Sequence, residues 1–169
     1  MKTFKILSIL CIAFSIFSCD PEENSTETPN IDLMAESISF SVVVDSNNPF
    51  TGVATITGTI RNIGDNYMSN HNQQSIYLYE RSLGTPTTQL GTLVAQQSFQ
   101  NLDTDETAQV TFSRTWNSSS PAEGEFPPEY IILISYDPDL YIDNNVHNDD
   151  TNQSNDQLLV SGEGINNLF

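Results

Sequence analysis

A period-two alternation of apolar and polar residues is the feature that most limits how this chain can fold. It is clearest in residues 53–62, where one face carries Ala54, Ile56, Gly58 and Ile60 and the other Thr55, Thr57, Thr59 and Arg61. Successive side chains of a β-strand point to opposite faces, so this segment is predicted to be a half-buried strand. No segment shows a convincing helical period, and the alternation therefore predicts a β-sheet protein.

Further strands are predicted from the same pattern, separated by turns rich in Gly, Pro, Asn and Asp. They span residues 31–44, 75–80, 89–99, 106–116, 130–136 and 157–160. The parity changes near Glu36 and Ser37, which predicts a β-bulge in the first strand. Residues 130–136 are apolar on both faces, as in a central strand, and Trp116 is expected in the core. About seven strands of this kind predict an all-β, antiparallel β-sandwich.

The first 18 residues have the parts of a secretory signal peptide and lie outside the predicted fold. Lys2 and Lys5 precede an apolar run that is too short to span a bilayer, which takes about 20 residues. The following residue, Cys19, occupies the position that is lipidated in bacterial lipoproteins. A plain secreted protein cut nearby is the alternative. Several acyl chains on Cys19 would hold the protein to a membrane.

Removal of the signal peptide leaves three arginines and no lysine against 22 acidic residues, a net charge of −19. Binding to nucleic acid requires basic side chains that displace counterions from phosphates, so we expect no nucleic-acid partner. Cys11 leaves with the signal and Cys19 would carry lipid, so the exported part has no disulfide. Its stability must come from a hydrophobic core.

The chain divides into four predicted parts. Residues 1–18 are the signal peptide, residues 19–30 the lipidated cysteine and a flexible tether, residues 31–160 one domain, and residues 161–169 a C-terminal tail. The tether has no large apolar residue with which to stabilise an ordered structure.

The order of short motifs along the domain resembles the CARDB family, the cell-adhesion-related domains of bacteria. The matching pieces are Ile31-Asp32-Leu33, residues 54–64 ending in Asn62-Ile63-Gly64, residues 76–79, residues 102–112, Tyr136-Asp137-Pro138-Asp139 and Asp150-Thr151-Asn152-Gln153. The resemblance implies an immunoglobulin-like fold and a binding or spacer role at the cell surface.

The densest polar segment, residues 137–156, contains six aspartates and several asparagines. We expect a solvated loop whose side chains hydrogen-bond their own backbone. No cofactor is predicted, with calcium as the alternative, because calcium takes six to eight oxygen ligands. Its first ligands would be Asp137, Asp139 and Asp143.

Two sets of side chains are candidates for a binding surface. Tyr77 and Tyr79 point outward if Ile76 faces the core, and outward tyrosines can stack on sugars. Ile131 and Leu133 would form an apolar outer face, unless the C-terminal segment or a neighbouring strand covers them.

The chain shows no catalytic motif and is not predicted to be an enzyme. His71 and His147 are each expected in an exposed loop. We predict a surface-displayed lipoprotein that acts as a non-enzymatic adhesion or interaction module for a protein or glycan ligand. The alternatives are a glycan-capture lipoprotein of a nutrient-uptake system and a structural accessory of an envelope complex.

The residues after Cys19 bear on which way the domain faces. The acidic run Asp20, Glu22 and Glu23 resembles the surface-export signal of Bacteroidetes lipoproteins. The expected location is the outer membrane, with the domain facing the cell exterior. A periplasm-facing domain is the alternative.

Overall fold

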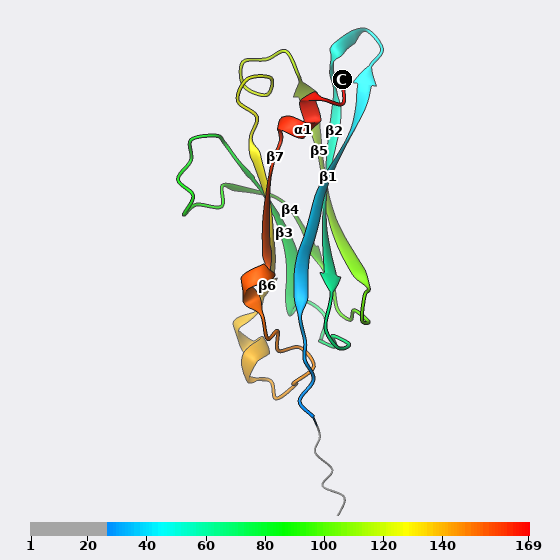
Figure 1. Cartoon of the computed structure of the whole chain (residues 1–169), viewed down its shortest axis with the longest axis vertical. Helices are drawn as coiled ribbons and strands as arrows, with labels where there is room; N and C mark the ends of the chain where they lie inside the picture. The colour runs from blue at the N-terminus through cyan, green and yellow to red at the C-terminus, as the bar shows by residue number, and fades with distance from the viewer. Residues whose placement is uncertain (1–26) are drawn as a thin grey trace, which may run out of the picture.

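Two antiparallel sheets packed face to face make up the protein (Figure 1). The computed structural model describes residues 27–169, so the predicted signal peptide, Cys19, Asp20, Glu22 and Glu23 lie outside the described residues. One sheet has the order β1-β2-β5 and the other β4-β3-β6-β7. The predicted all-β antiparallel sandwich is confirmed, whereas the finer immunoglobulin-like classification stays a prediction.

The seven strands lie at the seven predicted places, although β2 begins five residues before the predicted residue 53 and β4 is shorter than the predicted residues 89–99. The strands are β1 (Leu33–Asp45), β2 (Asn48–Asn62), β3 (Gln74–Arg81), β4 (Thr92–Ser98), β5 (Thr107–Asn117), β6 (Glu129–Tyr136) and β7 (Gln157–Ser161). Two short 3-10 helices follow β6, namely η1 (Pro138–Ile142) and η2 (Gln153–Asn155). A four-residue helix, α1 (Glu163–Asn166), follows β7. None of the helices among the described residues is long and apolar enough to cross a membrane.

The predicted bulge in the first strand is present. The pairing of β1 with β2 shifts register between Ala35 and Ser37, so Glu36 has no direct partner on β2. The extra residue keeps Leu33 and Ala35 on the core side together with Ile38, despite their opposite parity in the sequence.

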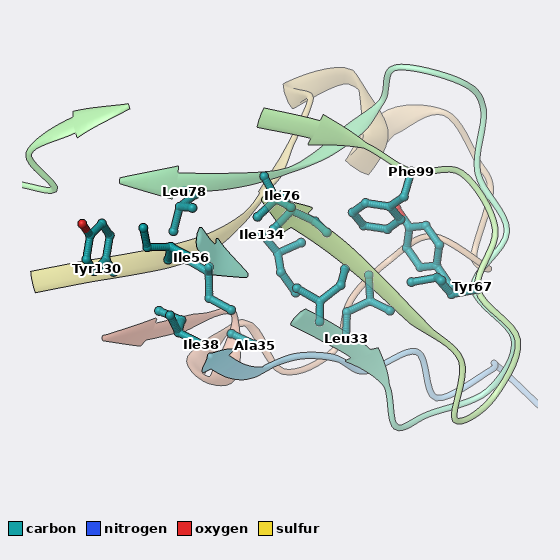
Figure 2. Packing of buried hydrophobic residues seen from close by; sticks show 14 of the residues in the cluster. Leu33, Ala35, Ile38, Ile56, Tyr67, Ile76, Leu78, Phe99, Tyr130 and Ile134 are labelled. Carbon is teal, nitrogen blue, oxygen red and sulfur yellow. The ribbon is translucent and has the colours of Figure 1, made fainter. Parts of the chain in front are cut away.

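The core lies between the inner faces of the two sheets (Figure 2). Ile56 of β2 and Ile76 of β3 are fully buried, and Trp116 is only 2% exposed, as expected for a core residue. The indole N–H of Trp116 donates to Asn166 Oδ1 of α1 at 2.9 Å. The fully buried side chain of Ile165, also in α1, belongs to the same core. Part of the predicted C-terminal tail is therefore integral to the sandwich.

Asn62 explains why an Asn-x-Gly motif ends β2. Its buried side chain donates to the backbone oxygens of Asp65 and Leu102, both at 2.8 Å, and accepts from the N–H of Gly64 at 3.0 Å. A Cβ on Gly64 would overlap the backbone oxygen of Asn30. The motif thus ties the turn after β2 to the residues that lead into β1.

Arg114, which interrupts the apolar face of β5, faces a carboxylate of the opposite sheet. Its guanidinium donates to Glu80 of β3 at 2.8 and 2.9 Å and to Glu123 at 2.8 Å, and it lies 5.5 Å from the centre of the Trp116 ring. The Tyr130 hydroxyl donates to Glu80 at 2.9 Å. This network joins the two sheets where the core ends.

Candidate functional site

The outer face of the four-stranded sheet carries side chains in rows that run across the strands. The register places Leu93, Tyr79, Ile131 and Leu159 in one row. The next row contains Gln96, Tyr77, Leu133 and Gln157, and a third contains Ser98, Ser75 and Ser135. The face therefore changes from apolar and aromatic to neutral and polar along the strands. We call these eleven residues the outer face.

Tyr77 and Tyr79 lie on the outer face as predicted, and both are half-buried. Their rings form an edge-to-face pair with centroids 6.1 Å apart and an interplanar angle of 78°. Burial, followed by the neighbouring Tyr77 phenol, raises the pKa of Tyr79 above its usual value. Both residues offer ring surface together with a hydroxyl.

The two aliphatic residues predicted beside them differ in exposure. Leu133 is half-buried, whereas Ile131 is fully buried. The expectation that Ile131 offers a contact surface is therefore wrong, because its cross-strand neighbours Tyr79 and Leu159 flank it. The neighbouring strand β7 provides this cover, while the C-terminal helix packs through Ile165 into the core instead.

Two exposed residues of this surface were missed by the sequence reasoning. Leu93 is 45% exposed and Leu159 is 39% exposed, and they lie at the two ends of the apolar row. The outward parity of Leu159 within residues 157–160 is visible in the sequence. Its place beside Ile131 depends on strand pairing, which the sequence does not give.

A polar groove of about 490 Å³ adjoins Tyr77 at the start of β3, beside the row of serines. Ser75 Oγ lies 3.2 Å from Ser98 Oγ and accepts from Gln96 Nε2 at 3.1 Å. Ser135 and Asp137 lie on the other side of the groove. Hydroxyl and amide groups beside an aromatic ring can bind an uncharged polar ligand such as a sugar.

A second, more apolar cleft of about 620 Å³ lies where the β1–β2 hairpin meets β5. Val43, Val53 and Trp116 contribute to its walls, and Val43 is 76% exposed. The hairpin projects at the end of the molecule that carries the C-terminus, opposite the end where the chain enters β1 (Figure 1).

Two of the three predicted calcium ligands, Asp137 and Asp143, accept hydrogen bonds within their own loop. Asp137 Oδ1 accepts from the N–H of Asp139 at 3.0 Å and caps η1. Asp143 accepts from the N–H of Asn145 and from Asn148 Nδ2, both at 2.8 Å, and these bonds lower its pKa. Among residues 27–169, no group of three His, Cys, Asp or Glu side chains is placed to hold a metal ion. The structure thus does not bring Asp137, Asp139 and Asp143 together as ligands.

The histidines lie in exposed loops, as expected for His71 and His147.

No protein-family model matches the chain, and no curated protein matches it significantly. The resemblance to CARDB domains therefore stays a prediction based on the order of the motifs.

Proposed function

We propose that this chain is a lipid-anchored, non-enzymatic recognition module displayed at the cell surface, which binds its ligand through the outer face. The observation that carries the proposal is the aromatic pair Tyr77 and Tyr79 beside exposed Leu93 and Leu159. Aromatic and apolar side chains that stay accessible on a charged protein are typical of interaction sites.

The two ends of the domain suit a tethered recognition module. The described chain enters the sandwich through β1 at one end of the molecule, and the β1–β2 hairpin lies at the opposite end (Figure 1). A tether that starts at Cys19 would hold the first end near the membrane and leave the outer face and hairpin accessible.

Labelled palmitate should enter the wild-type chain and not Cys19→Ala. External protease should cleave the anchored protein on intact cells if the domain faces outward, and only after lysis if it faces the periplasm.

A pull-down from intact cells tests the recognition role. The double variant Tyr77→Ala/Tyr79→Ala should lose captured partners, because the ring surface disappears while the core residues Ile76 and Leu78 remain. Phe126→Ala is the matched control, since Phe126 is an exposed aromatic residue (58%) in a loop outside the outer face. Equal capture by both variants and the wild type would contradict a role for the outer face.

Glycan capture for a nutrient-uptake system is the second candidate, favoured by the polar groove beside Tyr77. Its hydroxyl and amide side chains include Ser75, Ser135 and Gln96. A glycan array probed with the purified full chain should then give signals that weaken at least tenfold in Tyr77→Ala. An array with no signal would remove this candidate and leave protein recognition.

A structural accessory role in an envelope complex is favoured by the apolar cleft of the hairpin. A photocrosslinker introduced at Val43 should then capture another envelope protein in living cells. Crosslinking at Leu93 and not at Val43 would place the contact on the outer face instead.

A further inference from the structure

Three aspartates meet where the start of β1, the end of β6 and the loop before β7 come together. Asp150 and Asp156 are 9% and 5% exposed, and Asp32 lies beside them at the entry to β1. Asp150 Oδ2 accepts from the N–H of Leu33 at 3.0 Å and from the Tyr136 hydroxyl at 2.9 Å. Its Oδ1 accepts from the N–H of Asn152 at 2.8 Å. We call Asp32, Asp150 and Asp156 the carboxylate cluster.

Asp156 is the member of the cluster whose carboxylate has the fewest hydrogen-bond donors. Its Oδ1 is buried and has no hydrogen-bond partner, and the same holds for the neighbouring Asn155 Oδ1. Its carboxyl lies beside those of Asp150 and Asp32 and within hydrogen-bonding reach of Asp150 and the Tyr136 hydroxyl. A buried acceptor without a donor costs free energy, so this site lacks a binding partner.

No basic side chain of the described residues supplies that partner. The arginines pair elsewhere: Arg61 with Glu36, Arg81 with Glu129, and Arg114 with Glu80 and Glu123. The chain has no lysine beyond Lys2 and Lys5, which precede the described part. Buried carboxylates are normally paired with a cation, bound to a metal or protonated. A metal ion or a proton must therefore compensate the cluster.

We propose that a hard divalent cation of the calcium class binds at the carboxylate cluster, held by Asp150 and Asp156 with neutral oxygens around them. The neutral oxygens nearby are the Tyr136 hydroxyl and Asn155 Oδ1, whose amide nitrogen donates to Asp32 at 2.8 Å. Asp32 adds charge beside them. No group of three acidic side chains in the described part is placed to hold a metal ion, so the proposed site has two carboxylate ligands, and water and neutral oxygens complete the shell. Calcium accepts such mixed sets of six to eight oxygens.

This site differs from the loop site that the sequence suggested, because its residues come from distant parts of the chain. Asp150 already fixes the N–H of Leu33, 117 positions away in sequence. A bound cation would strengthen the junction between the loop before β7 and the residues that follow the tether. The expected consequence is a domain base that stays folded when the tether is pulled.

Calcium binding is measured on the purified full chain after treatment with chelator. Isothermal titration with calcium chloride should show one saturable site per chain, and the melting temperature should rise with calcium concentration by mass action. Sodium chloride at equal ionic strength separates this effect from screening of the acidic surface.

Isosteric variants locate the ion. Asp156→Asn should weaken calcium binding at least tenfold, and Asp32→Asn should weaken it by a smaller factor. Asp139→Asn is the matched control, because Asp139 is an exposed aspartate of the preceding segment, and it should leave the affinity unchanged.

Two results would overturn the proposal. The first is a melting temperature and titration indifferent to calcium, which would mean that a proton shared by Asp150 and Asp156 compensates the cluster. The second is binding that survives in Asp156→Asn and is lost in Asp139→Asn or Asp143→Asn. That outcome would place calcium in the loop after β6.

Discussion

Asn62 shows how one side chain can determine a turn. The buried side chain of Asn62 makes three hydrogen bonds, of which the one to the backbone oxygen of Leu102 is buried and those with Asp65 and Gly64 are partly buried. Asn62→Ala should lower the free energy of unfolding by about 3 kcal/mol, because three hydrogen bonds worth about 1 kcal/mol each are lost. Urea denaturation checks this. Asn167→Ala, at an exposed position, is the control and should change stability by less than about 0.5 kcal/mol.

Asp156 predicts a pH dependence of stability when divalent cations are removed. Its carboxyl faces Asp150, Asp32 and Tyr136, and its pKa is raised from 3.8 in the unfolded chain to about 8 in the fold. The folded chain thus keeps a proton that the unfolded chain has released. The resulting stability is full below about pH 4 and is lost as pH rises through about 8.

Thermal unfolding in chelator between pH 5 and 9 measures this effect. Stability should fall by up to roughly 1 kcal/mol per pH unit towards pH 8, and Asp156→Asn should flatten the curve because its amide does not titrate. A wild-type curve as flat as that of the variant would mean that Asp156 is ionised throughout the range.

From the sequence, the side chains that face the core can be predicted better than the pairing of the strands. The alternation in residues 53–62 places Ile56 and Ile60 in the core, because a pleated strand allows only two faces. It cannot tell which strand pairs with which, so Leu93 and Leu159 were not recognised as parts of one surface with Tyr79. The same limit applies to the predicted calcium ligands, which all come from residues 137–143. A sequence shows which aspartates are neighbours along the chain, whereas Asp32 and Asp156 meet only through the fold.

The two sheets pack closely at Gly58 of β2. A Cβ there would overlap Ile132 Cγ2 on β6 of the opposite sheet, so Gly58→Ala should destabilise the protein by about 1–3 kcal/mol through overpacking. Ile132→Ala alone should cost about 2–5 kcal/mol, because it leaves a cavity.

The double variant tests whether these costs have one origin. Gly58→Ala/Ile132→Ala should lose at least about 1 kcal/mol less than the sum of the single variants, because the new methyl group occupies the space that Ile132 vacates. Chemical denaturation of the four proteins gives the coupling free energy. Strict additivity would show that Gly58 is required for its backbone conformation instead of for the approach of the sheets.

At the scale of the whole molecule, charge opposes folding. The chain has 22 acidic residues against five basic ones, and each of the three arginines in the described part already contacts a carboxylate. The remaining carboxylates repel one another across a sandwich whose core must compensate for that repulsion. Salt shortens the reach of this repulsion from about 30 Å at 0.01 M to about 10 Å at 0.1 M.

Sodium chloride should therefore stabilise the protein, although it weakens the individual surface ion pairs. Because the ion pairs among the described residues are few, and those of Arg61 and Arg114 are partly exposed, screening of the net charge should dominate. The melting temperature in chelator at pH 7 should rise by several degrees between about 10 and 300 mM salt. The same titration at pH 4 is the control, since many carboxylates are then protonated and the rise should shrink. A melting temperature that falls with salt at pH 7 would show that the arginine pairs, led by the Arg114 network, outweigh the repulsion.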